Sequence, residues 1–248
     1  MPIDGQVTAV QRAGKALQRI PAVHRSAVLG LQAVGWARRG GQLNRYLRDT
    51  PPDKRKLALG SGAMTLAGWL CTDLVPVKPS VVYLDAVRRW PVPPASFRYV
   101  LCEHMFEQVS YDAGLRLLAE ARRALCPAGV LRISTPDLEV VRLLPDSEDP
   151  DVQEYVRWSN RTFGSPAERK EVDSAVHALN RVMRSWGHSY LYDETTLRHA
   201  LQLSGFQQIR RCLPGESEHA ELLGGDRHAA LIGELPNRVE SLILEASG

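Results

Sequence analysis

The chain has 248 residues, of which 44% are hydrophobic and 24% are charged, and its formal net charge is +3. This composition is ordinary for a soluble globular protein, and no uninterrupted apolar run reaches the roughly 20 residues of a membrane-spanning helix. The N-terminus lacks the basic flank and apolar core of a signal peptide, so we expect a cytoplasmic protein without a transmembrane segment. The four cysteines form no Cys-x-x-Cys pair, which predicts buried, reduced thiols.

The first 56 residues are strongly basic, with eleven Lys and Arg against three Asp and Glu. Apolar residues recur at near-helical spacing within 6–47, which predicts two or three helices interrupted at Pro21 and at Gly40-Gly41. We interpret 1–55 as a basic helical cap that packs on the main domain. Attraction to an anionic substrate or a membrane surface is the alternative, and no basic motif interleaved with aromatic residues indicates nucleic-acid binding.

From Lys56 onward, short apolar strands alternate with helices. This rhythm predicts an α/β domain over 56–248 with a doubly wound, mainly parallel, seven-stranded sheet. The expected strands are 57–59, 69–72, 81–84, 99–102, 130–134, 206–212 and 239–244. Amphipathic helices are expected at 111–125 and 195–203.

Residues 140–186 interrupt this alternation. Two stretches within them, 152–163 and 167–186, have helical character, and the whole segment is long for a connection between a strand and a helix. We therefore expect an inserted helical lid.

Glycines and carboxylates follow the first three expected strands, at the edge where open parallel sheets bind ligands. Gly60-Ser61-Gly62 follows the first strand, and glycine there permits positive φ and a close backbone approach. Asp73 follows the second strand, where two carboxylate oxygens match the vicinal hydroxyls of a ribose. Asp85 follows the third, where a carboxylate can accept from an adenine amino group. Each aspartate could instead be a surface turn residue, and Thr65 replaces the third glycine of a dinucleotide-binding G-x-G-x-x-G motif.

Taken together, these segments resemble the cofactor-binding half of class I S-adenosylmethionine (SAM)-dependent methyltransferases, and within them the type 11 group associated with glycan and natural-product pathways. The resemblance covers roughly 56–140 and 186–228. It is carried by residues 56–62, 68–73, 84–85, 90–91, 96–99, 103–104, 125–129, 133–139, 187–193 and 204–206. It implies a Rossmann-like fold, SAM as methyl donor and S-adenosyl-L-homocysteine as product.

The resemblance also implies a cofactor site by position. Gly60 and Gly62 would face the methionine and ribose portions of SAM, Asp73 would hold the ribose hydroxyls, and Glu103 would flank the sulfonium. The full set of expected cofactor-binding residues is Gly60, Ser61, Gly62, Asp73, Asp85, Ala86 and Glu103.

The chain departs from the family pattern in three places. The thirteen residues from Gly60 to Asp73 leave little room for the usual first helix. Arg98 stands where the family often has Asp. Gln108 stands where related sequences often have a second histidine, which argues against a metal pair in that motif.

Three residues are candidates for catalysis. His104 follows the fourth strand and is the first choice as general base, because imidazole titrates near neutrality. Asp137 follows the fifth strand and could orient a base or bind a substrate hydroxyl. His188 could reach the pocket from the lid, and residues 226–228 could bind the acceptor. A divalent metal stays open, because no pair has clear ligand spacing.

We therefore expect SN2 methyl transfer to a hydroxyl of a small molecule, with a sugar, glycan or natural product as acceptor. N-methylation of a small amine and a non-catalytic SAM-fold binding module are the alternatives. A nicotinamide oxidoreductase is disfavoured by the missing third glycine. Nucleic acid is not an expected partner, and a homodimer is left open.

Overall fold

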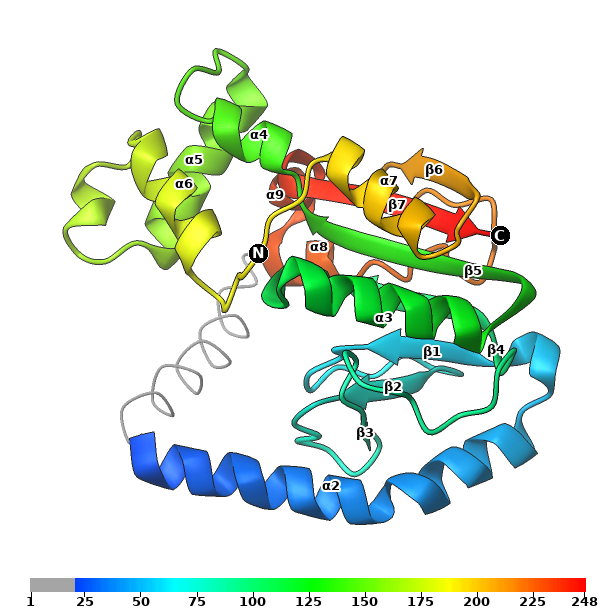
Figure 1. Cartoon of the computed structure of the whole chain (residues 1–248). Coiled ribbons are helices and arrows are strands. Elements are labelled where there is room, and N and C mark those ends of the chain that lie inside the picture. The colour runs from blue at the N-terminus through cyan, green and yellow to red at the C-terminus, as the bar shows by residue number, and fades with distance from the viewer. Residues whose placement is uncertain (1–20) are drawn as a thin grey trace.

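The computed structural model describes the backbone of residues 21–248 and the side chains of 25–248 (Figure 1). The expected helical positions between 6 and 20 lie outside the described residues. Seven strands form one sheet in the order β3-β2-β1-β4-β5-β7-β6. The strands are β1 (Lys56–Leu59), β2 (Leu70–Asp73), β3 (Val82–Tyr83), β4 (Phe97–Glu103), β5 (Leu125–Pro136), β6 (Gln208–Cys212) and β7 (Ser241–Ser247).

The first five strands pair in parallel, and β7 runs antiparallel to both of its neighbours. This confirms the predicted doubly wound, mainly parallel, seven-stranded sheet of the Rossmann-like type. The chain leaves β1 toward β2 and β3 on one side and returns through β4 and β5 on the other. The topological switch point therefore lies between β1 and β4.

The central strands are largely apolar and buried because both of their faces are covered. Val100, Leu101 and Cys102 of β4 are at most 1% exposed, as are Leu131 and Ile133 of β5. These buried strands fix where the carboxyl ends emerge, and hence where functional side chains can gather.

Two amphipathic helices cover one face of the sheet (Figure 1). They are α3 (Tyr111–Ala124) and α7 (Glu194–Leu203), close to the predicted ranges. Ser110 and Asp193 cap their N-termini by accepting from the N–H groups of Ala113 and Thr196.

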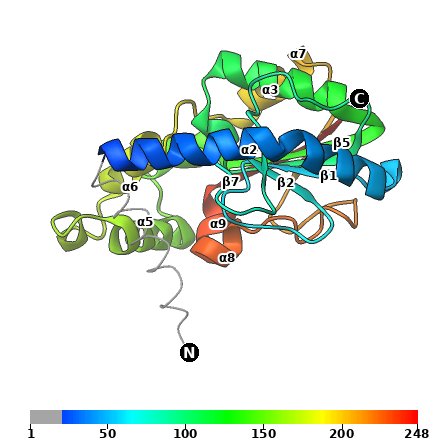
Figure 2. The same cartoon turned by 90° about the horizontal axis from the view of Figure 1, so that it is seen from below.

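The N-terminal region contains one long helix, α2 (Pro21–Asp49), followed by the short η1 (Pro52–Lys54). Figure 2 shows α2 running along the sheet, and it packs mainly against β3. The predicted break at Gly40-Gly41 is wrong, because the helix continues through both glycines. A helical glycine costs only about 1 kcal/mol relative to alanine. Docking offsets that cost: Leu43 is 3% exposed, and Gly35 approaches Pro76 so closely that a Cβ would lie 2.4 Å from its Cγ.

The segment after β5 is helical, as expected, and has a small core of its own. It consists of α4 (Leu138–Leu143), α5 (Pro150–Phe163), η3 (Glu168–Lys170) and α6 (Ala175–Arg184). The second expected helix is shorter than predicted, because the carbonyls of Val172 and Ser174 turn toward the side-chain amide of Asn160. Near the C-terminus, α8 (His228–Ile232) and α9 (Glu234–Glu240) precede β7, and α9 contacts α5. Within 21–248, none of the helices combines the length and apolar character needed to cross a membrane.

A buried arginine joins the sheet to the loop that leads into α8. Arg132 on β5 is 0% exposed, and its guanidinium donates to both carboxylate oxygens of Asp226, at 3.0 and 2.5 Å. It also donates to Glu245 on β7, at 2.7 Å, and to the carbonyl of Glu216, at 2.9 Å. The loop 213–227 is thereby held against the sheet.

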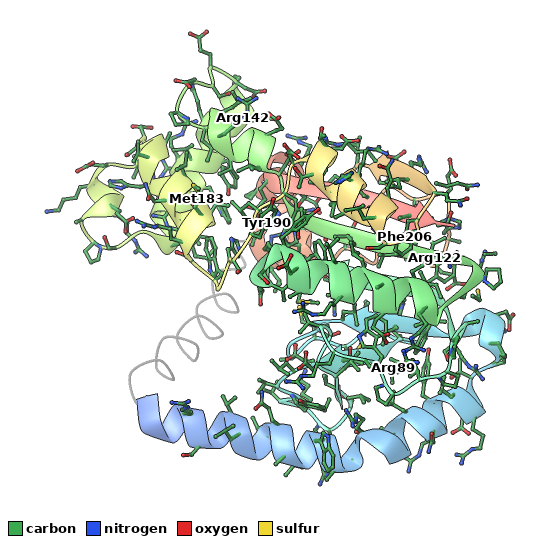
Figure 3. The ribbon with its side chains drawn as sticks, in the orientation of Figure 1. Arg89, Arg122, Arg142, Met183, Tyr190 and Phe206 are labelled. Carbon is green, nitrogen blue, oxygen red and sulfur yellow. The ribbon has the colours of Figure 1, made fainter. Side chains whose placement is uncertain are left out.

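We predict that Arg132→Met lowers the free energy of unfolding by about 3–5 kcal/mol, because it leaves two buried carboxylates without their partner. Urea denaturation at neutral pH measures the change. Arg142 on α4 is the matched control (Figure 3), since its ion pair with Glu139 leaves both side chains about half exposed. Arg142→Met should cost under about 1 kcal/mol, and an equally small effect at Arg132 would contradict the prediction.

Candidate functional site

The glycine loop after β1 is tied to the end of β2. Gly60 and Gly62 adopt φ of +60° and +56°, in the left-handed region that favours glycine. The N–H of Gly62 donates to Asp73 Oδ2 at 2.8 Å, and the N–H of Val75 donates to Asp73 Oδ1 at 2.7 Å. Ser61 is buried, and its N–H donates to the carbonyl of Thr72 at 2.9 Å. The structure therefore brings three predicted residues, Gly60, Ser61 and Gly62, together with Asp73.

The space above Gly60 is filled by Met105. A Cβ on Gly60 would lie 2.4 Å from Met105 Cγ, so no larger residue fits there without a shift. Methionine has three rotatable side-chain bonds and can repack more easily than a branched residue. The glycine loop is thus in direct contact with the loop that follows β4.

Asp85 and Ala86 lie in a turn next to Asp73. The N–H of Leu84 donates to the carbonyl of Asp73 at 3.0 Å, so the two strand ends adjoin. The Asp85 carboxylate accepts from Val87 N–H at 3.2 Å and pairs with Arg88 Nε at 3.0 Å. These contacts stay within its own turn, and no contact links the carboxylates of Asp85 and Asp73.

Glu103 at the end of β4 anchors the start of α8. Its carboxylate accepts from the N–H groups of Arg227 and His228, the latter at 2.9 Å, and pairs with Arg227 Nε at 3.2 Å. Glu103 was expected beside the cofactor, and its carboxylate is instead occupied by these contacts. Its visible role is to place His228 at the carboxyl edge of the sheet.

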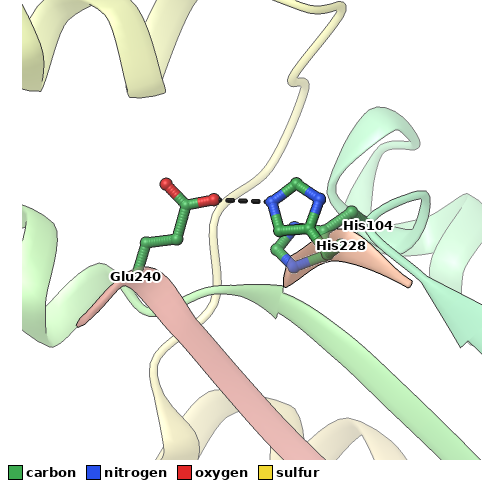
Figure 4. Close-up of side chains that lie close together, drawn as sticks. All are labelled: His104, His228 and Glu240. Atoms are coloured by element: carbon green, nitrogen blue, oxygen red, sulfur yellow. Dashed lines mark hydrogen bonds and ion pairs between the residues drawn. The ribbon is translucent and has the colours of Figure 1, made fainter. Parts of the chain in front are cut away.

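Five residues form what we call the histidine cluster: His104, Glu107, His188, His228 and Glu240. The rings of His104 and His228 stack with centroids 3.6 Å apart and an interplanar angle of 22°. His228 Nε2 lies 2.8 Å from Glu240 Oε1 (Figure 4). The second oxygen of Glu240 accepts from the Tyr155 hydroxyl at 2.7 Å. His104 has a φ of +44°, and its Nε2 lies 3.2 Å from Ser241 Oγ.

Glu107 in η2 (Phe106–Gln108) adjoins two of the imidazoles and is 1% exposed. One carboxylate oxygen lies 3.8 Å from His104 Nδ1 and 3.8 Å from His188 Nε2, and the other has no hydrogen-bond partner. His188 Nδ1 lies 2.5 Å from the carbonyl of Val182. In the neutral ring, Nδ1 therefore carries the hydrogen and Nε2 faces Glu107 as an acceptor.

Burial shifts the charge states of this cluster. It raises the pKa of Glu107 to about 8 and lowers the pKa of His188. The pKa of His104 falls well below its usual value, first through burial and then through repulsion from His228 and His188. His104 is therefore a neutral imidazole near pH 7 and can accept a proton.

The backbone of Asp137, and not its side chain, contacts the histidine cluster. Its N–H donates to the carbonyl of Glu240 at 2.7 Å. Its carboxylate accepts from Glu139 N–H at the start of α4 and from Arg211 on β6, at 3.0 and 2.9 Å. The carboxylate thus caps a helix and binds an arginine, and no contact joins it to His104.

Sequence reasoning named His104 and His188 but missed Glu107 and Glu240. Glu107 had a weak signal, because it follows His104 by three residues on the same loop. Glu240 had none, since it is 136 residues away from His104 in the chain and was placed within an expected strand. His228 was considered only as part of a polar loop.

Two surface hollows lie away from this edge. One is lined by residues of the opposite edge, including Ala95, Leu125 and Gly248, and the other lies in the helical segment beside Pro145 and Gln153. Neither contains a residue of the glycine loop or of the histidine cluster. The case for a site at the carboxyl edge therefore rests on the side chains gathered there.

No protein-family model and no curated protein matches the chain. Among solved structures, it is similar to a SAM-dependent methyltransferase from Archaeoglobus fulgidus, with 12% identity over 84% of this chain and 92% of that chain, and a TM-score of 0.45. It is also similar to PigF solved with SAH, with 13% identity over 82% and 53% of the two chains and a TM-score of 0.43. The chain thus spans about half the length of PigF.

A third similar structure is the methyltransferase in a complex with the Haloferax volcanii Trm112 activator. The identity is 13% over 89% of this chain and 95% of that chain, and the TM-score is 0.44. At such identities and TM-scores, these likenesses say nothing of substrate or partner.

The raised pKa of Glu107 predicts a pH-dependent cost of folding. Unfolded, this carboxyl titrates near 4.5, and folded, near 8. Between these values the unfolded chain releases a proton that the folded chain keeps, so rising pH favours unfolding by roughly 1.4 kcal/mol per pH unit. Glu107→Gln removes this titration. In EDTA, the free energy of unfolding of the variant minus that of the wild type should increase by roughly 2–3 kcal/mol from pH 5 to pH 7.

Denaturant unfolding at pH 5, 6 and 7 measures this difference, in which the pH dependence common to the two proteins cancels. Glu154→Gln is the control, because the Glu154 side chain on α5 is nearly half exposed and pairs with Arg157. Its difference from the wild type should stay level across the range. A level difference for Glu107→Gln as well would refute the prediction.

Proposed function

We propose that this chain binds SAM at the carboxyl edge of β1, β2, β3 and β4 and transfers its methyl group to a hydroxyl of a small molecule. The observation that carries the proposal is the bond between Asp73 and the N–H of Gly62. It holds a left-handed glycine loop against a strand-end carboxylate at the topological switch point, where doubly wound sheets bind ligands.

The residues present fit an adenosyl group. Each oxygen of Asp73 accepts one backbone N–H, so each retains a lone pair for a ribose hydroxyl. The glycine loop offers backbone without side chains, and Met105 has to move from above Gly60 to admit the ligand. Asp85, in the adjoining turn, and the backbone of Ala86 are the proposed contacts for the adenine.

When bound, SAM supplies an electrophilic methyl group on a sulfonium. The chain's own task is to align the acceptor, which is worth on the order of 7–11 kcal/mol, to exclude water and to remove a proton. His104 is the proposed base because its imidazole is neutral. It is the first residue after β4, and the next residue, Met105, contacts Gly60 of the glycine loop. A positioned base contributes roughly 10²–10⁴-fold. His188 faces the same cluster from the helical segment, and Asp137 is proposed to act through the backbone at Glu240.

The acceptor class comes from the sequence resemblance alone. A sugar, glycan or natural-product hydroxyl is the proposed acceptor. Small-molecule N-methylation is the alternative within the same chemistry, and a SAM-binding module without turnover is the alternative outside it.

We expect Asp73→Asn to weaken SAM binding roughly 10- to 100-fold, because hydrogen bonds to a charged group contribute about 1.5–3 kcal/mol. Titration calorimetry with SAM and with S-adenosylhomocysteine measures the loss, and NAD should not bind to either protein. Asp146→Asn, in an exposed turn after α4, is the matched control and should bind like the wild type. The proposal fails if the wild type binds neither adenosyl compound, or if Asp73→Asn binds both undiminished.

We expect His104→Asn to keep SAM binding within about twofold and to lower methyl transfer roughly 10²–10⁴-fold. Asparagine tolerates the left-handed backbone of this position. Transfer of label from methyl-labelled SAM to a panel of sugars and small phenols gives the rate. His199→Asn, exposed on α7, is the control. Unchanged transfer in His104→Asn would remove the histidine from the proposed mechanism.

A further inference from the structure

Part of the histidine cluster has the composition of a metal site. One ring nitrogen of His104, one of His228 and one carboxylate oxygen of Glu240 lie within 4.8 Å of one another. Figure 4 shows the three side chains converging from separate elements: the loop after β4, the start of α8 and the end of α9. Two imidazoles and a carboxylate are donors that first-row transition ions such as Zn²⁺ prefer.

The cluster also lacks positive charge. Within the part of the chain that the structure describes, no Lys or Arg nitrogen lies within 4.0 Å of the Glu107 or Glu240 carboxylate, and their ion-pair partners are histidines. Glu107 is 1% exposed, and one of its oxygens has no hydrogen-bond partner. A buried carboxylate is costly without a partner, and a cation bound to the neighbouring imidazoles would stabilise it.

We propose that His104, His228 and Glu240 bind a divalent transition-metal ion of the Zn²⁺ type, with Glu107 behind them compensating its charge. The ion replaces the hydrogen between His228 Nε2 and Glu240. The three protein donors leave one tetrahedral position free, as in zinc sites that take an exchangeable ligand.

The residues around the three donors are arranged to support them. The Tyr155 hydroxyl donates to the outer oxygen of Glu240 at 2.7 Å. Ser241 Oγ lies 3.2 Å from His104 Nε2 and donates to Asn237 Oδ1 at 3.0 Å. Partners of this kind orient metal ligands, and their loss weakens binding about 10- to 100-fold.

Binding needs one local change. The two rings are stacked, so their in-plane lone pairs do not meet at one point. One ring has to turn about its side-chain bonds. The donor atoms then close from at most 4.8 Å to the roughly 3.3 Å that separates neighbouring ligands in a tetrahedral zinc site.

The proposed metal site does not need a second histidine at position 108, where related sequences often have one. Gln108 replaces the second histidine next to Glu107, but His228 reaches His104 from α8, 124 residues further along the chain. Its position is fixed by Glu103, whose carboxylate accepts the His228 N–H. The metal ligands lie in the loop after β4, on α8 and on α9, and none of them is a proposed SAM contact. The two proposals share His104, because an ion bound to its lone pair would prevent it from acting as the base. SAM binding is the part of the proposed function that does not depend on the ion.

The test uses the untagged full-length chain after dialysis against EDTA. Calorimetric titration with Zn²⁺ should show one ion per chain, and Co²⁺ should give visible ligand-field absorption. Glu240→Gln and His228→Ala should weaken binding at least about tenfold. Glu240→Gln keeps an oxygen for the Tyr155 hydroxyl, and circular dichroism with thermal unfolding in EDTA checks that it folds.

Glu171→Gln is the matched control. Glu171 lies 3.1 Å from His177 in an exposed pair, and no second histidine belongs to that pair. It should bind Zn²⁺ like the wild type. Zn²⁺ should also raise the melting temperature of the wild type but not that of Glu240→Gln. The proposal is overturned if the wild type binds no ion, or if Glu240→Gln binds Zn²⁺ as tightly as Glu171→Gln. SAM binding by the same samples shows separately whether the proposed function holds.

Discussion

The arrangement of the carboxyl edge depends on the buried guanidinium of Arg132. It extends from β5 next to Glu245 of β7 and is neutralised by Asp226 and Glu245. By holding Asp226, it fixes the residue just before Arg227 and His228, whose N–H groups then reach the Glu103 carboxylate. The His228 ring in turn lies on His104. A buried charge that is shared between Glu245 of β7 and Asp226 of this loop thus determines where a histidine stands some distance away.

Two groups of side chains meet at this edge because of strand order. β1 and β4 are neighbours, and Leu59 pairs with Cys102, so Gly60 and Glu103 emerge side by side. The first group consists of the glycine loop and Asp73, whose carboxylate accepts backbone N–H groups. The second group follows β4 and consists of buried imidazoles and carboxylates. Met105 lies between the two groups, over Gly60. A methyl donor on one side and a proton acceptor on the other is the division of labour that the proposed reaction requires.

The sheet could be predicted from the sequence because buried parallel strands are apolar runs, and the residues after each run share one edge. The positions of Gly60, Asp73 and His104 at strand ends were predicted in this way. Glu240 and His228 could not be, since their approach to His104 depends on ion pairs between segments far apart in the chain. The predicted helix break at Gly40-Gly41 was wrong because docking of α2 outweighs the low helix propensity of glycine. Glu103 was placed correctly on its strand, but its partner Arg227 is visible only in three dimensions. The division into cap, SAM-binding domain and lid stays a prediction.

Residues 60–69 run from β1 to β2 as a series of turns, and several of their amide hydrogens already have partners within the protein. Ser61 donates to Thr72, Gly62 to Asp73, and Met64 to Ser61. In sheets that grip a pyrophosphate, free amides and the positive end of a helix dipole face the ligand at this position. Here the carboxylate of Asp73 makes the local electrostatic potential negative instead. A diphosphate would be repelled by this edge, whereas a ligand with a positive centre would be attracted to it.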